Sequence, residues 1–170
     1  MRKQGAKDQI ITLMAQWQTI AARILQGHRV ASGLNQNPRF PGGTLRMQIP
    51  HFLALGLDLR IFYPGTLNVN ITPNRYRVIK ARHSFANVKW HPTEPAEDFS
   101  FFDVRLRCLD GPSVEGLIYY PHPETKPEHF QQPGVLELLL PFVEGLRYGD
   151  EVRLEIPASQ MAIKPPGLQS

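Results

Sequence analysis

Phe102-Asp103-Val104-Arg105-Leu106-Arg107-Cys108 is the stretch of this chain that most directly indicates its fold. Apolar and charged residues alternate along it, and alternate side chains of an extended strand point to opposite faces. One face is therefore expected in a core and the other at the surface. Asp110-Gly111-Pro112-Ser113 follows with residues typical of a turn and leads into a second apolar run at residues 114–120. Together these segments predict an antiparallel hairpin.

Outside this hairpin, the chain also contains short runs in which residues are apolar or alternate between apolar and charged. Residues 135–140 form another apolar run, and Val152, Leu154 and Ile156 alternate with charged residues. The 170 residues include 16 prolines and 13 glycines, which disfavours a helical bundle and favours short strands joined by tight turns. Hydrophobic residues make up 42%, enough for one core. We therefore expect a mostly β domain.

Helical patterning is strongest near the N-terminus. Over residues 8–26 apolar side chains recur at spacings of three and four, which predicts a helix that packs across the domain or against a partner. Asp8 would cap its start and Gly27 its end. A short second helix is predicted at residues 50–56, with Pro50 in its first position. Residues 164–170 are expected to form a loose tail.

Cysteine content and hydropathy suggest the compartment. Cys108 is the single cysteine, so no intrachain disulfide forms, and we expect it in the core. No run approaches the roughly 20 apolar residues of a membrane span, and the N-terminal residues lack a signal-peptide core. These features predict a cytoplasmic protein without a membrane partner. The sequence leaves open whether it is a monomer or a homodimer.

Basic residues are densest at positions 75–90. The members are Arg75, Arg77, Lys80, Arg82 and Lys89, with Tyr76, Phe85 and Trp90 between them. Such a face could bind single-stranded nucleic acid through phosphate contacts and base stacking. The alternative is a solvated strand face, which the modest net charge of +4 favours. Nucleic-acid binding is therefore kept as a less favoured hypothesis.

Tyr63-Pro64-Gly65-Thr66-Leu67-Asn68 has the clearest chemical potential. The Pro-Gly pair predicts a turn that leads into a strand. Thr66 and Asn68 are two residues apart, so their side chains are expected on one face of that strand. A hydroxyl and an amide oxygen suit Mg²⁺, which takes oxygen ligands. The alternative is that both residues serve only local turn and strand-edge preferences.

Several segments occur in an order that carries a family resemblance. They are Val30-Ala31-Ser32-Gly33-Leu34, residues 52–57, residues 63–69, Thr125, Leu136-Glu137-Leu138 and residues 146–152. In this order the chain resembles the archaeal CTP-dependent riboflavin kinases over about residues 27–157, with Pro-Gly-Thr-Leu-Asn the most specific part. The resemblance implies a small, closed, six-stranded cradle-loop (RIFT-like) β-barrel at residues 27–160. Residues 1–26 would be a helical extension and 161–170 a tail.

The resemblance also implies a set of site residues. Thr66 and Asn68 would ligate Mg²⁺, Thr125 and Glu137 would contact riboflavin, and Glu137 would lie close to the reacting hydroxyl. Glu137 stands out independently, because a carboxylate within the apolar run 135–140 is costly to bury unless it is paired or functional. The alternative is that it faces water on an edge strand. The implied activity is the phosphorylation of riboflavin to FMN by a nucleoside triphosphate.

The segment expected to bind the nucleotide departs from the family pattern. Ser32, Gly33 and Leu34 match it, but the next glycine is missing, and Pro38 and Pro41 follow. Further members of the predicted nucleotide site are Arg39, Gly42 and Gly43, with Thr44 beside them. Residues 142–145 correspond to the family's base-recognition region. This departure favours an alternative function, a non-catalytic flavin or nucleotide sensor.

Two other site classes have little support. His83, His91, His122 and His129 show no zinc-ligand spacing, and no cysteine pair accompanies them, so exposed loop histidines are expected. No Gly-x-Ser-x-Gly motif supports a serine hydrolase.

Overall fold

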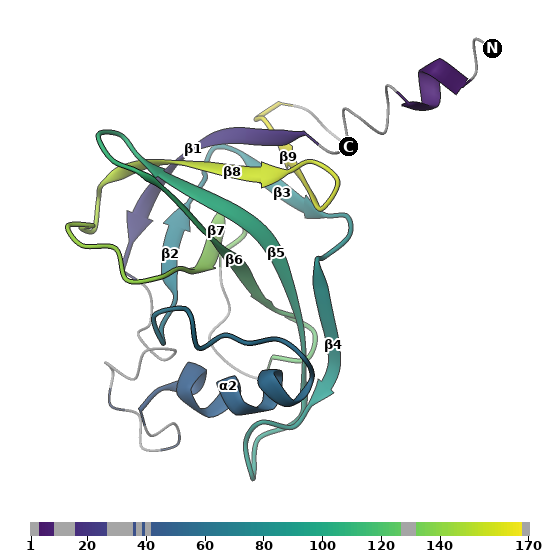
Figure 1. Ribbon diagram of the computed structural model, residues 1–170, viewed down its shortest axis with the longest axis vertical. Coiled ribbons are helices and arrows are strands. Elements are labelled where there is room, and N and C mark those ends of the chain that lie inside the picture. The colour runs from purple at the N-terminus through teal and green to yellow at the C-terminus, as the bar shows by residue number, and fades with distance from the viewer. Residues whose placement is uncertain are drawn as a thin grey trace.

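The computed structural model describes residues 4–8, 16–26, 36, 39, 42–126 and 132–167. Strands dominate these residues, accompanied by a short helix at residues 4–8 and by α2 (Thr44–Ala54). The strands are β1 (Trp17–Leu25), β2 (Leu67–Asn70), β3 (Arg75–Val78), β4 (His83–Val88), β5 (Glu97–Cys108), β6 (Ser113–Pro121), β7 (Val135–Leu139), β8 (Glu151–Pro157) and β9 (Met161–Lys164). Figure 1 shows their arrangement. The predicted mostly β class is confirmed.

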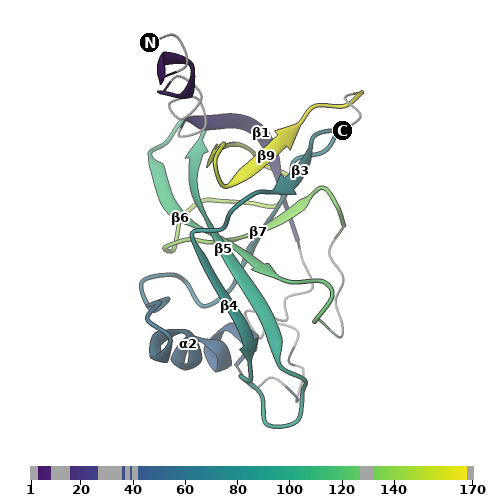
Figure 2. The same cartoon turned by 90° about the vertical axis from the view of Figure 1, so that its right-hand side faces the viewer.

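The main sheet closes on itself. Its strand order is β4-β5-β6-β7-β2-β1-β8, and β5 also pairs with β8, so six strands form a ring. The long strand β5 makes this possible, because its first part pairs with β4 and its last part with β8. β3 and β9 form a separate two-stranded ribbon, which lies at the opposite end of the molecule from α2 (Figure 2).

The inside of the ring is apolar. Val104 and Leu106 of β5 pack there with Ile118, Leu138 and Leu154 from other strands. The alternation predicted for residues 102–108 is confirmed, since the intervening charged residues lie on the other face. The predicted hairpin is also present, as β5 and β6 pair across the turn at residues 109–112. Cys108 is only partly buried, at the edge of this core.

A second core lies between α2 and the outer face of β5, β6 and β7. Phe52 of α2 is fully buried, and its ring meets those of Phe99 and Phe101 edge to face at 5.1 Å each. Leu117 and Leu139 extend this core along β6 and β7. Edge-to-face aromatic packing adds to the apolar burial. This core therefore attaches α2 to the sheet.

The helix predicted over residues 8–26 is wrong for most of its length. Helix covers residues 4–8, whereas Trp17–Leu25 is strand β1, paired with β2 on one side and β8 on the other. Burial along β1 alternates strictly, with Ala22 and Ile24 inside the ring. Hydrogen bonding on both edges and this period-two burial outweigh the local helical pattern.

Two further boundaries differ from expectation. α2 begins six residues before the predicted helix, and Pro50 lies inside it rather than in its first position. The segment 161–164 is a strand paired with β3, so ordered structure reaches Lys164 at the start of the predicted tail. Residues 165–167 are exposed. The local sequence patterns were compatible with this helix and this strand, but they did not determine the residues at which each begins and ends.

Glu97 is a buried acid at the start of β5. It is 5% exposed, and Trp90 donates its indole N–H to a Glu97 carboxylate oxygen at 2.8 Å. Burial raises the pKa of Glu97, while the Trp90 hydrogen bond and the charge of Lys126 act in the opposite direction. The net rise means that the folded protein holds the Glu97 proton more tightly than the unfolded chain does.

Glu97→Gln is therefore expected to raise the free energy of unfolding at pH 7. In the wild-type protein, protonated Glu97 contributes to stability at low pH. This contribution is lost as the pH rises from about 4.3, the pKa of a glutamate in the unfolded chain, through the higher pKa of Glu97 in the folded protein. The gain in the variant should vanish below about pH 4, where Glu97 is protonated. Urea unfolding at pH 4 and pH 7 measures this, with exposed Glu115→Gln as the control. A variant less stable than wild type at pH 7 would contradict the expectation.

Candidate functional site

A row of side chains crosses the outer face of the sheet. Asn68 of β2 is paired with Glu137 of β7, Glu137 with Tyr119 of β6, and Tyr119 with Phe101 of β5. Directly paired residues of antiparallel strands place their side chains on the same face, about 5 Å apart. Tyr119 and Phe101 belong to the core beneath α2. The whole row therefore lies on the face that α2 partly covers.

Thr66 joins this row from the turn before β2. Its Oγ1 donates a hydrogen bond to Oε1 of Glu137 at 3.1 Å, linking residues 71 positions apart. Asn68 follows two residues later, on the same face. The structure thus brings together Thr66, Asn68 and Glu137, three residues that the sequence had marked in two separate segments. The direct contact between the Thr66 hydroxyl and the Glu137 carboxylate could not be read from spacing.

Asn68 has an unusual environment for an amide. It is only 7% exposed, and its side chain makes no hydrogen bond to any residue that the structure describes. Among the described residues, Arg105 Nε is the one side-chain nitrogen or oxygen that is both fully enclosed and without a hydrogen-bond partner. The amide atoms of Asn68 are therefore not fully enclosed. The Asn68 amide can thus contact water or a ligand that reaches this face of the sheet.

The donor set fits a hard cation. A hydroxyl, an amide oxygen and a carboxylate are oxygen ligands of the kind that Mg²⁺ prefers. The hydrogen of the Thr66 hydroxyl points to Glu137, which leaves lone pairs on Oγ1 for a metal. Thr66 and Asn68 therefore have the chemistry that magnesium binding requires.

Two tyrosines, the buried Tyr119 and the half-buried Tyr76, have pKa values that are raised mainly by burial. Burial raises the pKa of Tyr119 well above its usual value, and the charges of Glu137 and Glu97 add to the rise. Burial also raises the pKa of Tyr76 to about 12, with further contributions from Tyr120 and Glu137. Both phenols therefore stay neutral at physiological pH.

Tyr119 also connects the row to α2, which the sequence did not suggest. Its hydroxyl donates to Oε1 of Gln48 at 2.8 Å, and Gln48 is buried. A buried polar pair of this kind fixes how the helix lies on the sheet. The sequence offered no clear signal for Gln48, because the buried face of α2 also contains the polar Thr44.

Thr125 lies in the turn that follows β6. Its Oγ1 accepts the backbone N–H of Asp98 at 2.9 Å and donates to the carbonyl oxygen of His122 at 3.1 Å. These bonds hold the turn against the start of β5. No hydrogen bond joins Thr125 to Glu137 among the described residues, so its role in flavin binding stays a prediction.

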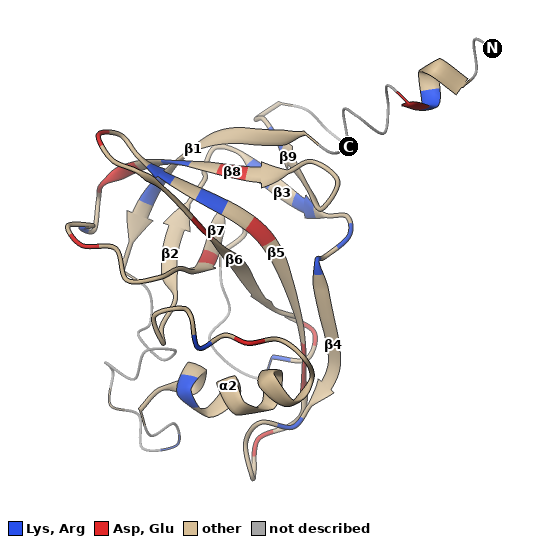
Figure 3. Cartoon of the chain, in the orientation of Figure 1, with Lys and Arg blue, Asp and Glu red and all other residues tan. Residues whose placement is uncertain are grey.

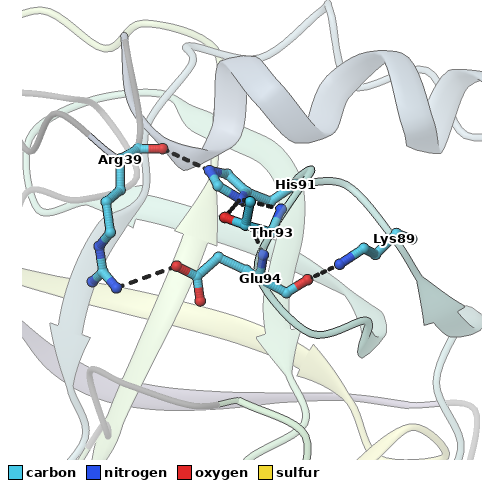
Figure 4. A network of polar contacts seen from close by, with 5 residues as sticks. All are labelled: Arg39, Lys89, His91, Thr93 and Glu94. Atoms are coloured by element: carbon cyan, nitrogen blue, oxygen red, sulfur yellow. Dashed lines mark hydrogen bonds and ion pairs between the residues drawn. The ribbon is translucent and has the colours of Figure 1, made fainter.

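Arg39 is held in a network of polar contacts (Figure 4). Its guanidinium pairs with a Glu94 carboxylate oxygen at 3.2 Å, and its carbonyl oxygen meets Nε2 of His91 at 2.8 Å. The backbone N–H groups of Thr93 and Glu94 donate to Nδ1 of His91, so neutral His91 carries its proton on Nε2 and donates to Arg39. Lys89 donates to the Glu94 carbonyl. The Arg39 charge is thus already paired.

The other residues predicted to bind the nucleotide lie before α2. Ser32, Gly33 and Leu34 fall outside the described residues. Gly42 and Gly43 have φ angles of 75° and 96°, in the region that favours glycine, and they lead directly into α2. The sequence analysis had assigned both glycines to the nucleotide site. Their role in nucleotide binding stays a prediction.

The histidines form no metal cluster in the part of the chain that the structure covers. No group of three or more His, Cys, Asp or Glu side chains is placed there to hold an ion, and His129 lies outside it. His122 contacts the Ser100 hydroxyl at 2.7 Å, and Ser100 contacts the Ser84 hydroxyl at 2.9 Å. Ser100 is 3% exposed in the middle of β5. These contacts link β4 and β5 to the residue that follows β6, and Ser100 is not an accessible nucleophile.

The basic stretch at residues 75–90 offers little aromatic surface. Trp90 is buried and Phe85 packs against the core beneath α2, while Tyr76 is half-buried against the ring interior. Arg75 and Arg77 are exposed on β3, and Figure 3 shows basic residues on this strand and on the segment that leads to β4. The rings that were expected to stack on bases are thus largely taken up by packing.

Comparison with known proteins adds no assignment. The chain matches no protein-family model and no curated protein. No helix within the described ranges is long and apolar enough to span a membrane. Inference about function therefore rests on the geometry of the Thr66, Asn68 and Glu137 cluster and on the sequence resemblance.

Proposed function

We propose that the protein is a riboflavin-kinase-like phosphotransferase, which uses a nucleoside triphosphate and Mg²⁺ to convert riboflavin to FMN. The observation that carries the proposal is the meeting of Thr66 and Asn68 with Glu137 on one face of the sheet. The resemblance assigns these three residues to metal binding and to the reacting hydroxyl, roles that require them to be close. We also infer that the six-stranded ring is the closed cradle-loop barrel of that family.

The chemistry would use each residue of the cluster. Thr66 and Asn68 would hold Mg²⁺, which supplies charge neutralisation for the phosphate oxygens. Glu137 would accept the proton of the ribityl 5′-hydroxyl while that oxygen forms a bond to the terminal phosphorus and the bond to the nucleoside diphosphate breaks. The Thr66 hydrogen bond holds the Glu137 carboxylate in position. Riboflavin and the nucleotide are thus the expected small-molecule partners.

The direct test combines purified protein, riboflavin and Mg²⁺ with CTP, ATP, GTP or UTP in separate reactions. Formation of FMN, followed by chromatography, is expected with at least one donor. No FMN with any donor, from a protein whose melting temperature still rises with flavin or nucleotide, would instead identify a non-catalytic binding module. The altered segment at residues 35–41 is what keeps this second function in view.

Thr66→Ala and Asn68→Ala are each expected to raise the Mg²⁺ concentration needed for half-maximal FMN formation by about 10–100-fold. Each variant removes an oxygen that would bind the metal. A magnesium titration of the initial rate measures the effect. Asn70→Ala is the matched control, because it changes the same residue type on the same face of β2, where the Asn70 amide bonds the backbone of Thr72. Unchanged magnesium dependence in both variants would exclude this metal site.

A further inference from the structure

A chain of hydrogen-bonded side chains begins at an exposed hydroxyl on β4. Ser84 is exposed, and its Oγ lies 2.9 Å from Oγ of Ser100, the residue directly opposite on β5. Oγ of Ser100 lies 2.7 Å from Nε2 of His122, and Nδ1 of His122 lies 3.3 Å from Oε1 of Glu124. An accessible serine is thus connected, through a second serine, to an imidazole and a carboxylate.

The carboxylate sets the direction of these hydrogen bonds. A carboxylate only accepts, so the neutral ring of His122 carries its proton on Nδ1 and donates it to Glu124. Nε2 then accepts the hydrogen of Ser100. Since Ser100 has one hydroxyl hydrogen, its oxygen accepts the hydrogen of Ser84. Both hydroxyls therefore donate toward the imidazole, the orientation in which a histidine withdraws a proton from a nucleophile.

The backbone on either side holds the imidazole in place. The N–H of His122 donates to the carbonyl oxygen of Asp98 at 2.9 Å. Its own carbonyl oxygen accepts the hydroxyl of Thr125 and the backbone N–H groups of Thr125 and Lys126, each at 3.1 Å. The ring packs edge to face on Tyr120, with centroids 5.4 Å apart. A base fixed by packing and hydrogen bonds is ready to accept a proton.

This chain of side chains is separate from the row that contains Glu137. Ser100 is directly paired with Tyr120, and each precedes or follows a residue of the row, Phe101 or Tyr119. Neighbouring residues of a strand point to opposite faces of a sheet. The two groups of side chains therefore lie on opposite faces, and the chemistry of one does not require the other.

The position of β4 leaves room for a ligand. This strand ends the strand order of the main sheet, and within the described residues β5 is its one partner. Alternate backbone N–H groups of an edge strand point away from the sheet and have no ladder partner. Donors of this kind can stabilise negative charge on an oxygen that forms beside Ser84. A nucleophile, a base and candidate oxyanion donors thus occur at one open edge.

We propose that Ser84 is an activated nucleophile that accepts acyl groups from carboxylic esters, an activity beyond the kinase proposed above. Its oxygen bonds to the ester carbonyl carbon while its proton passes to Ser100 and the Ser100 proton passes to Nε2 of His122. The imidazolium, beside Glu124, returns a proton through Ser100 to the alcohol as the bond between that alcohol and the carbonyl carbon breaks. Water then attacks the acyl-serine and gives one proton to the same side chains, which return a proton to Ser84 as the carboxylic acid leaves.

A fluorophosphonate probe tests the nucleophile directly, because its phosphorus bonds to an activated serine oxygen with loss of fluoride. Peptide mass spectrometry is expected to find the label on Ser84. Hydrolysis of p-nitrophenyl acetate, measured without Mg²⁺ or nucleotide, is expected to fall about 100-fold in His122→Ala, with part of the rate restored by added imidazole. Ser84→Ala should lose both the label and the hydrolysis. Ser113→Ala, at an exposed serine of β6, is the matched control and should change neither.

Three results would overturn this assignment. They are absence of label on Ser84 in the folded wild-type protein, ester hydrolysis retained by Ser84→Ala, and unchanged labelling in folded His122→Ala. Thermal melting shows whether the His122 variant is folded. If it is not, Ser100→Ala provides the same test, because it removes the connecting hydroxyl with little change in volume. Labelling that persists in Ser100→Ala would equally reject activation by the imidazole.

Discussion

Glu137→Gln is expected to lower kcat for FMN formation by about 10²–10⁴-fold, the usual contribution of a general base. The amide cannot accept the proton of the riboflavin hydroxyl. It can still accept the hydrogen bond that Thr66 donates to the carboxylate, so the local structure is expected to persist. Initial rates over ranges of riboflavin and nucleotide concentration measure kcat and KM separately, and thermal melting checks the fold.

A matched control separates this effect from a general change of charge. Glu115→Gln makes the same replacement on β6, at an exposed position outside the row of site residues. It is expected to leave both kcat and the melting temperature close to the wild-type values. If Glu137→Gln retains kcat within a few-fold of wild type, Glu137 is not the base, and the Thr66 contact is then only a structural bond across the sheet.

Phe52→Ala is expected to lower the free energy of unfolding by about 3–5 kcal/mol, the usual cost of removing a buried phenylalanine side chain. Phe52 is fully buried, and its ring contacts Phe99, Phe101 and Phe85. The substitution leaves a void between α2 and the sheet, and both transfer and packing energy are lost. Urea unfolding measures the change.

Leu53→Ala is the control on the adjacent position of α2. Leu53 is 39% exposed, so its truncation should cost well under half as much while changing helix propensity in a similar direction. A loss below about 1 kcal/mol for Phe52→Ala would mean that α2 is not held by this core.

Local patterns predicted the parts of the fold that one strand or one turn can specify. The alternation at residues 102–108 and the turn at 110–113 correspond to β5, β6 and their hairpin. The same reasoning failed at residues 17–25, where apolar residues satisfy helical spacing and strand alternation at once. Pairing of β1 with both β2 and β8 resolved that ambiguity, and such pairing is not visible within a single segment.

The sequence by itself determined which residues can do chemistry and which strand face each occupies. Thr66 and Asn68 share a face because side chains alternate, and Glu137 is conspicuous because a carboxylate interrupts an apolar run. Only the tertiary structure decided which of them meet. The register of β2 against β7 places Asn68 opposite Glu137, and the packing of Phe52 on Phe101 places α2 on the same face of the sheet. Register and docking depend on contacts between distant segments, whose energies no local pattern contains.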